Sequence, residues 1–171
     1  MQLIRDLQKR KYKYECKTHL TNTSKRQIKW WLMNLRQVNG NPIVPDLIIF
    51  YDASKMSWGA VSNGVRTNKK WSAQEKMLHK NVLELKGVLL AIEALLKKQS
   101  QITVSLNMDN STAVSYINHK RGTHSMELIL LTLELWDWCM LKDIYLTAQH
   151  VPGRTNSLAT RESREFRDET D

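Results

Sequence analysis

The order of short apolar segments and longer amphipathic segments after Pro45 restricts the possible folds of this 171-residue chain more than any other feature. The apolar run Leu-Ile-Ile-Phe-Tyr at residues 47–51 is typical of a buried strand, and Asp52 follows it directly. Residues 58–64 and 66–71 predict two more strands that turn at Asn63-Gly64, a pair common in two-residue hairpins. This region therefore predicts an antiparallel meander.

Predicted helices and strands alternate in the second half of the chain. The patterns predict helices over 81–98, 111–118 and 124–140, strands over 102–108 and 144–149, and a short last helix from about Asn156. A meander followed by alternating helices and strands is typical of an α/β domain with a mixed sheet. We therefore expect a mixed five-stranded sheet flanked by helices over residues 46–171.

A strongly basic arm precedes this domain. Residues 1–43 hold ten Lys and Arg against two acids, a net charge of +8, whereas the whole chain carries +9. Residues 23–38 predict a helix that Thr23 or Ser24 can cap, and the Asn-Gly-Asn-Pro segment after it marks residues 1–45 as a separate arm. Such a charge favours a polyanionic partner such as nucleic acid, although a solvated helix face without a partner is the alternative.

Cysteine content and hydropathy exclude two classes of protein. Cys16 and Cys139 are far apart in the sequence, which argues against a disulfide scaffold and a cysteine-rich zinc module and favours a reducing compartment. No apolar run approaches the ~20 residues that a membrane-spanning helix needs. We therefore expect an intracellular protein, cytoplasmic or nuclear, with no membrane partner.

Polar residues follow three of the predicted strands. They are Asp52, Asp109 and His150. Binding sites of open α/β sheets gather where the ends of strands meet, which predicts that these side chains lie near one another. Asp is also common in turns and at helix starts, so each residue taken alone has a local structural explanation.

The position of Glu84 distinguishes this set from ordinary turn acids. At about 100° per residue, Glu84 lies on the same side of its predicted helix as Val88 and Ala91, and it faces the interior. A buried carboxylate is costly without a compensating group. Glu84 is therefore either paired with a lysine or backbone amides, or it is a metal ligand together with Asp52 and Asp109.

The metal interpretation has a specific chemistry. Hard divalent cations such as Mg²⁺ prefer carboxylate oxygens. Two such ions about 4 Å apart can activate water and stabilise the leaving oxygen when a phosphodiester is cleaved. Three inward carboxylates on a chain with a basic arm fit this chemistry better than proton transfer alone.

Four motifs in this order resemble ribonuclease H. They are Tyr-Asp-Ala-Ser at 51–54, Asn-Val-Leu-Glu-Leu-Lys at 81–86, Met-Asp-Asn-Ser-Thr-Ala-Val at 108–114, and His-Val-Pro-Gly at 150–153 followed by Asn156. The chain is most similar to the ribonuclease H domain of retrotransposon reverse transcriptases, particularly the DIRS type that carries a tyrosine recombinase. The resemblance covers about residues 46–164. It implies that residues 1–45 are a connection after the polymerase part of a polyprotein, and that Met1 is not a natural beginning.

The resemblance also implies a role for each site residue. Asp52, Glu84 and Asp109 would hold two Mg²⁺ ions, for which Mn²⁺ can substitute. His150, on a mobile loop after the last strand, would be the fourth catalytic residue and would assist proton movement or product release. The residues implied to bind the RNA–DNA hybrid are Ser54, Asn81, Asn110 and Asn156, with helix capping as the alternative for Asn81 and Asn156.

One position departs from the pattern of this family. The family places a fourth acid ten residues after the histidine, where this chain has Thr160. The predicted function is metal-dependent cleavage of the RNA strand of RNA–DNA hybrids by part of a retroelement reverse transcriptase. The missing acid leaves a weakened or inactive hybrid-binding or connection domain as the alternative. An integrase-like nuclease acting on DNA is disfavoured, because that branch of the fold places its Glu last.

Overall fold

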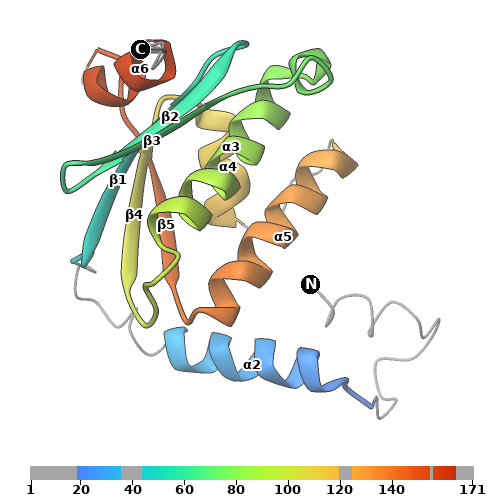
Figure 1. Cartoon of the computed structure of the whole chain (residues 1–171). Helices are drawn as coiled ribbons and strands as arrows, with labels where there is room; N and C mark the ends of the chain where they lie inside the picture. Colours follow the sequence, from blue (N-terminus) through green and yellow to red (C-terminus); the bar gives the residue numbers. More distant parts are fainter. Residues whose placement is uncertain (1–18, 36–43, 120–124, 155, 165–171) are drawn as a thin grey trace. The chain divides into compact units, whose positions relative to one another are not determined.

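Two compact units make up the chain in the computed structural model, which describes residues 19–35, 44–119, 125–154 and 156–164. Met1–Val44 fall in the first unit and Pro45–Asp171 in the second, and Figure 1 labels the helices and strands of both. None of the helices in the described ranges has the length and apolar character needed to cross a bilayer.

The first unit contains helix α2, Asn22–Leu35. The Thr21 hydroxyl accepts a hydrogen bond from the backbone N–H of Ser24 at 3.2 Å, and the Thr21 carbonyl accepts one from the N–H of Lys25 at 3.0 Å. Thr21 is therefore the capping residue, because its side chain satisfies an N–H of the first turn. The predicted caps Thr23 and Ser24 are wrong, and the predicted end of this helix lies outside the described residues.

A five-stranded mixed sheet forms the centre of the second unit, with the strand order β3-β2-β1-β4-β5. The strands are β1 Leu47–Ala53, β2 Ser57–Ser62, β3 Val65–Lys70, β4 Thr103–Met108 and β5 Tyr145–His150. Strands β1, β2 and β3 are antiparallel neighbours, whereas β1, β4 and β5 run parallel. The predicted mixed α/β sheet is confirmed.

The turn between β2 and β3 has the predicted chemistry. Asn63 has a φ of 48° and Gly64 a φ of 80°. Two-residue turns that follow the twist of a hairpin need positive φ at both positions, which Asn and Gly adopt at low cost. These two residues therefore set the register of the β2–β3 hairpin.

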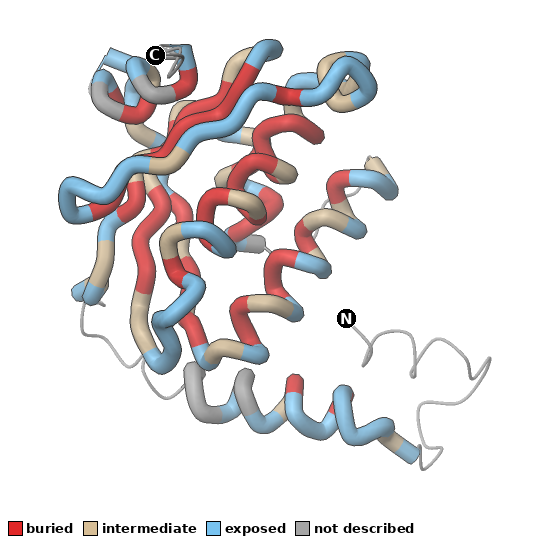
Figure 2. The backbone as a smooth tube through the Cα atoms, viewed as in Figure 1, coloured by how far each residue is buried: buried red, intermediate tan, exposed pale blue. Residues whose placement is uncertain are grey.

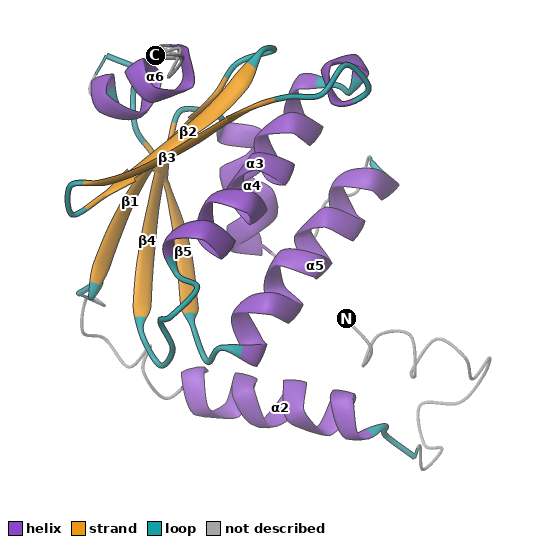
Figure 3. Ribbon diagram, viewed as in Figure 1, coloured by secondary structure: helices purple, strands orange, loops and turns teal. Residues whose placement is uncertain are grey.

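Within the described residues of the second unit, four α-helices flank the sheet. They are α3 Lys80–Leu95, α4 Ser111–His119, α5 Met126–Leu141 and α6 Ser157–Arg164. Helix α3 packs on β1 and β2, α4 packs on β5, and α5 packs on α3 and α4 (Figure 3). Helix α6 also packs on β1 and β2, but it contacts the opposite face of the sheet.

Adjacent residues of β1 show the two faces. The Tyr51 side chain bonds to α3, whereas the Asp52 side chain bonds to α6. Consecutive side chains of a strand alternate between the faces of a sheet, so this arrangement follows from the strand itself. Figure 2 shows buried residues concentrated in β2, β4 and α3. This core, which includes Ile49, Leu83 and Leu106, holds α3 against the sheet.

Candidate active site

Asp52 is part of β1. The sequence pattern predicted that it follows the strand directly. Its residue partner on β2 is Gly59, which has no side chain to cover it. Asp52 is only 5% exposed, and its Oδ2 accepts a hydrogen bond from the Ser163 hydroxyl at 2.5 Å. Burial raises the pKa of Asp52 above its usual value, the Ser163 hydrogen bond lowers it in part, and the charge of Asp109 raises it further.

Glu84 lies on the buried side of α3, as the helical pattern predicts, and is 1% exposed. The Tyr51 hydroxyl donates a hydrogen bond to the Glu84 carbonyl at 3.0 Å, which ties this turn of α3 to β1. One turn later, Gly87 faces the same tyrosine, and a Cβ there would collide with the Tyr51 hydroxyl. Gly87 therefore permits the close approach of α3 to β1 that places Glu84 beside the sheet.

The Glu84 carboxylate is buried without a hydrogen bond. Neither Oε1 nor Oε2 has a partner within the part of the chain that the structure describes. Burial and the charges of Asp52 and Asp109 raise the pKa of Glu84 from 4.5 to about 8, and the charge of Lys80 offsets the shift only in part. The alternative was a buried Glu whose oxygens bond to a lysine or to backbone amides. The described residues supply no such bond.

Asp109 directly follows β4 and is partly exposed. The loop after β5 passes close to it, since a Cβ on Gly153 would lie 3.3 Å from the Asp109 Oδ2 atom. The His150 Nε2 atom lies 3.1 Å from the Asp109 carbonyl oxygen. A carbonyl only accepts, so Nε2 carries the proton in this bond and Nδ1 is the basic nitrogen of the neutral ring.

His150 is not on a loop, as the resemblance implied, but is the last residue of β5. The reason is the parallel pairing of β5 with β4, in which Met108 is opposite His150 and the Met108 carbonyl accepts a hydrogen bond from the N–H of Val151. The imidazole is exposed at this strand end.

The structure brings the three predicted acids within electrostatic reach of one another. Burial raises the pKa of Tyr51, and Glu84, Asp52 and Asp109 all raise it further, in that order. Among the described residues, no three His, Cys, Asp or Glu side chains form a closed cluster that could hold one ion as they stand. The donor chemistry still fits a divalent cation, because the two buried oxygens of Glu84 have no partner and both neighbours are carboxylates.

Asn81 and Asn110 meet beside these acids. The Asn110 amide donates a hydrogen bond to the Asn81 side-chain oxygen at 3.2 Å, while the Asn110 oxygen caps α4 by accepting from the N–H of Ala113 at 2.9 Å. The capping alternative for Asn81 is wrong, because His79 caps α3 by accepting from the N–H of Asn81. The pair therefore links the starts of α3 and α4.

Ser54 and Asn156 have structural partners in this arrangement. The Ser54 hydroxyl accepts hydrogen bonds from the N–H groups of Met56 and Ser57, both at 3.1 Å, and shapes the β1–β2 turn. The Asn156 amide donates to the Tyr51 carbonyl at 2.8 Å and is buried, so it attaches the start of α6 to β1 rather than capping the helix. Contact of these residues with a hybrid stays a prediction.

Thr160 lies in α6, half-buried, where the family pattern has an acid. The α6 side chain that bonds Asp52 is that of Ser163, one turn further along. Sequence reasoning missed Ser163. The available signal was its spacing, since residues three apart share one face of a helix and Thr160 was already placed at the site.

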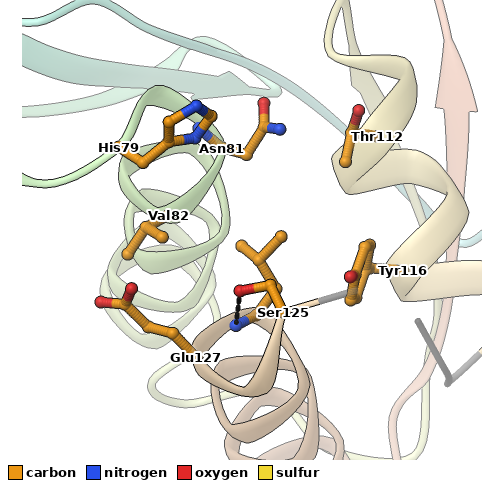
Figure 4. A pocket seen from close by; sticks show the side chains of 8 residues that line it. His79, Asn81, Val82, Thr112, Tyr116, Ser125 and Glu127 are labelled. Atoms are coloured by element: carbon orange, nitrogen blue, oxygen red, sulfur yellow. Dashed lines mark hydrogen bonds between the residues drawn. The ribbon is translucent and has the colours of Figure 1, made fainter. Parts of the chain in front are cut away.

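A cavity of about 340 Å³ opens next to the asparagine pair, between α3, α4 and α5. Figure 4 shows Asn81 of α3 and Thr112 of α4 on opposite sides of this hollow. The remaining lining residues are His79, Val82, Tyr116, Ser125, Glu127 and Leu128. None of the three acids lines this hollow, so it borders the asparagine pair rather than the carboxylates.

No protein-family model matches the sequence, and no curated protein matches it either. Solved structures do match. LC11-RNase H1 in complex with an RNA/DNA hybrid is 17% identical with a TM-score of 0.59, and the match covers 68% of this chain and 93% of that one. RNase H1 of Halobacterium salinarum is also 17% identical, with a TM-score of 0.56 and coverage of 68% and 92%.

A third match is the N-terminal RNase H domain of rv2228c from Mycobacterium tuberculosis. It is 15% identical with a TM-score of 0.55, and the match covers 70% of this chain and 91% of that one. Identities this low establish a fold and not an activity. The chain therefore contains a domain with the ribonuclease H fold.

Proposed function

We propose that this chain is a ribonuclease H-type endonuclease that cleaves the RNA strand of RNA–DNA hybrids with Mg²⁺ or Mn²⁺. The observation that carries the proposal is Glu84: a buried carboxylate with two unpartnered oxygens, beside Asp52 and Asp109, in this fold. A divalent cation supplies the charge that such a group lacks. The fold match to an RNase H1 that was solved with an RNA/DNA hybrid supports the choice of substrate.

Each residue has a separate task in this proposal. Asp52, Glu84 and Asp109 would hold the ions, and Tyr51 and Gly87 keep the Glu84 turn of α3 close to β1. Bound divalent ions would supply activation of water and stabilisation of the leaving oxygen. His150 lies at the exposed end of β5 with its Nε2 on the Asp109 carbonyl, and it would assist proton movement or product release.

Recognition of the hybrid rests on shape and charge. Asn81 and Asn110 present amide groups beside the acids, suited to the 2′-hydroxyls and base edges of a minor groove. The arm carries a net charge of +8, which favours phosphate backbones without reading their sequence. The hybrid is thus the partner that both features fit.

The retroelement context rests on the resemblance alone. The motif order and the arm of residues 1–45 are similar to those of DIRS-like reverse transcriptases, so we infer that the polymerase part of the same polyprotein is a second partner. A polymerase fragment that precedes residue 1 in the parent transcript would support this inference, and a parent transcript without one would refute it.

A second candidate is a hybrid-binding domain with weak or no cleavage. Thr160 at the acid position and the open arrangement of the three acids favour it. Both candidate functions predict that the chain binds the hybrid, but only the nuclease predicts efficient cleavage. A cleavage assay therefore separates them.

The test combines substrates, ions and one variant. We expect labelled RNA–DNA hybrid to be cut with Mg²⁺ or Mn²⁺ and to stay intact with EDTA, while double-stranded RNA and duplex DNA stay intact throughout. Asp109→Asn should abolish cleavage and keep hybrid binding. Asp143→Asn is the matched control, because Asp143 is exposed in the α5–β5 turn at a φ of 54°, which Asn also adopts. Binding without cleavage by the parent protein would establish the second candidate instead.

A further inference from the structure

Helix α6 reaches the candidate site through Ser163. The Ser163 hydroxyl lies 2.5 Å from Oδ2 of Asp52, and both residues are buried. The two residues are 111 positions apart in the sequence. Helix α6 packs on β1 and β2 on the face toward which Asp52 points, and the residue opposite Asp52 on β2 is Gly59.

The Ser163 hydroxyl has one proton and two acceptors within reach. The Thr160 carbonyl lies 3.0 Å from the same oxygen atom. A bond to a carboxylate is stronger than one to a neutral carbonyl, and here it is also the shorter, so the proton is donated to Asp52. This bond occupies Oδ2 and holds the carboxylate plane in one orientation.

Ser163 is itself held from the neighbouring strand. The Ser57 hydroxyl of β2 donates a hydrogen bond to the Ser163 carbonyl, and the Ser54 hydroxyl lies 3.5 Å from that carbonyl. Ser57 is as buried as Ser163. The Ser163 carbonyl is bonded to Ser57 of β2 and the Ser163 hydroxyl to Asp52 of β1, so both ends of the residue are held. The serine hydroxyl therefore has a defined position, unlike a flexible surface side chain.

We propose that Ser163 is a positioning residue that orients the Asp52 carboxylate for the divalent cation, with Ser57 holding Ser163 in place. The inference rests on the proposed function, because Asp52 needs a fixed orientation only if it is a ligand. The contribution of α6 is then the Ser163 hydroxyl, which contacts Asp52 one turn after Thr160. Partners that orient a metal-ligating carboxylate commonly change metal affinity or activity by about 10–100-fold when they are removed.

The direct test is Mn²⁺ binding to the full chain, measured by electron paramagnetic resonance of the free ion. Ser163→Ala should raise the Mn²⁺ dissociation constant about tenfold or more. Ser163→Thr, which keeps the hydroxyl, should restore part of the affinity. Ser157→Ala is the matched control, because Ser157 is an exposed serine of the same helix, and its dissociation constant should equal that of the parent protein.

A double-mutant cycle separates positioning from a general effect on folding. In an Asp52→Ala background, which removes the acceptor, Ser163→Ala should have no further effect on Mn²⁺ affinity. Circular dichroism melting of each variant shows that the binding data come from folded protein. If Ser163→Ala does not fold, Ser57→Ala tests the same anchor while Ser163 keeps its hydroxyl, and it should weaken Mn²⁺ binding in the same direction.

The possible outcomes distinguish this inference from the proposed function. Unchanged Mn²⁺ affinity in folded Ser163→Ala, an equal loss in the Asp52→Ala background, or no Mn²⁺ binding by the parent protein each overturn the inference. A parent protein that binds Mn²⁺ in a Ser163-dependent way yet cuts no hybrid refutes the proposed nuclease and leaves the inference standing. If the parent protein cuts the hybrid and Ser163→Ala cuts it equally fast, the proposed nuclease stands and the inference is refuted.

Discussion

Replacing Glu84 by Gln should change how the stability of the ion-free protein depends on pH. Folded Glu84 keeps its proton up to about pH 8, whereas in the unfolded chain it loses the proton near the ordinary value of 4.5. The folded state therefore binds more protons between these values, and the free energy of unfolding falls as pH rises through them. The stabilising contribution of the neutral acid is complete below pH 4.5 and lost by pH 8.

The expected size follows from that window. Each pH unit corresponds to about 1.4 kcal/mol, so the loss reaches about 3 kcal/mol at pH 7 and about 5 kcal/mol above pH 8. This is a large part of the roughly 5–15 kcal/mol by which domains are stable. Gln is neutral at every pH and has nearly the same shape, so Glu84→Gln removes the pH-dependent penalty and leaves any constant packing cost unchanged.

The assay is urea unfolding from pH 5 to pH 9 with EDTA present. We expect the difference in unfolding free energy between Glu84→Gln and the parent protein to shift in favour of the variant by several kcal/mol across this range. Glu93→Gln, on the exposed side of the same helix, is the matched control and should show no such trend. Adding Mg²⁺ at pH 8 should stabilise the parent and not Glu84→Gln. A difference that stays constant from pH 5 to pH 9 would refute the assignment of Glu84 as a neutral buried acid.

Three further predictions address packing, charge and the missing acid. Gly87→Ala should lower the free energy of unfolding by about 1–3 kcal/mol in urea denaturation, because its methyl group collides with the Tyr51 hydroxyl. The loss should shrink in a Tyr51→Phe background, and equal losses in both backgrounds would contradict the collision. Deleting residues 1–43 should weaken hybrid binding and flatten its dependence on salt, because +8 of the net charge of +9 is removed. A melting curve is the control, and an unchanged dependence of affinity on salt would show that the arm does not contact the hybrid. Thr160→Asp should raise the cleavage rate at limiting Mg²⁺, because a further carboxylate strengthens ion binding; a folded variant that cuts no faster at any Mg²⁺ concentration would favour the inactive hybrid-binding domain.

Much of the local structure could be predicted because it depends on residues that are neighbours in the sequence. The apolar run before Asp52, the Asn63-Gly64 turn and the inward position of Glu84 all follow from backbone preferences and from the periodicity of strands and helices. The strand and helix order also predicted the mixed sheet. Errors arose at element ends, where Thr21 caps α2 and where pairing with β4 draws His150 into β5.

Only the tertiary structure decided which side chains complete the site. Ser163 bonds Asp52 and Asn156 bonds the Tyr51 carbonyl across more than a hundred residues. Spacing within α6 indicates that Ser163 shares a face with Thr160, but it does not identify Asp52 as the partner. Both contacts depend on where α6 packs on β1 and β2, and the Ser57 hydroxyl of β2 bonds the end of that helix. Local sequence determines which face of a strand or helix a residue occupies, whereas its partner is determined by the element that packs on that face.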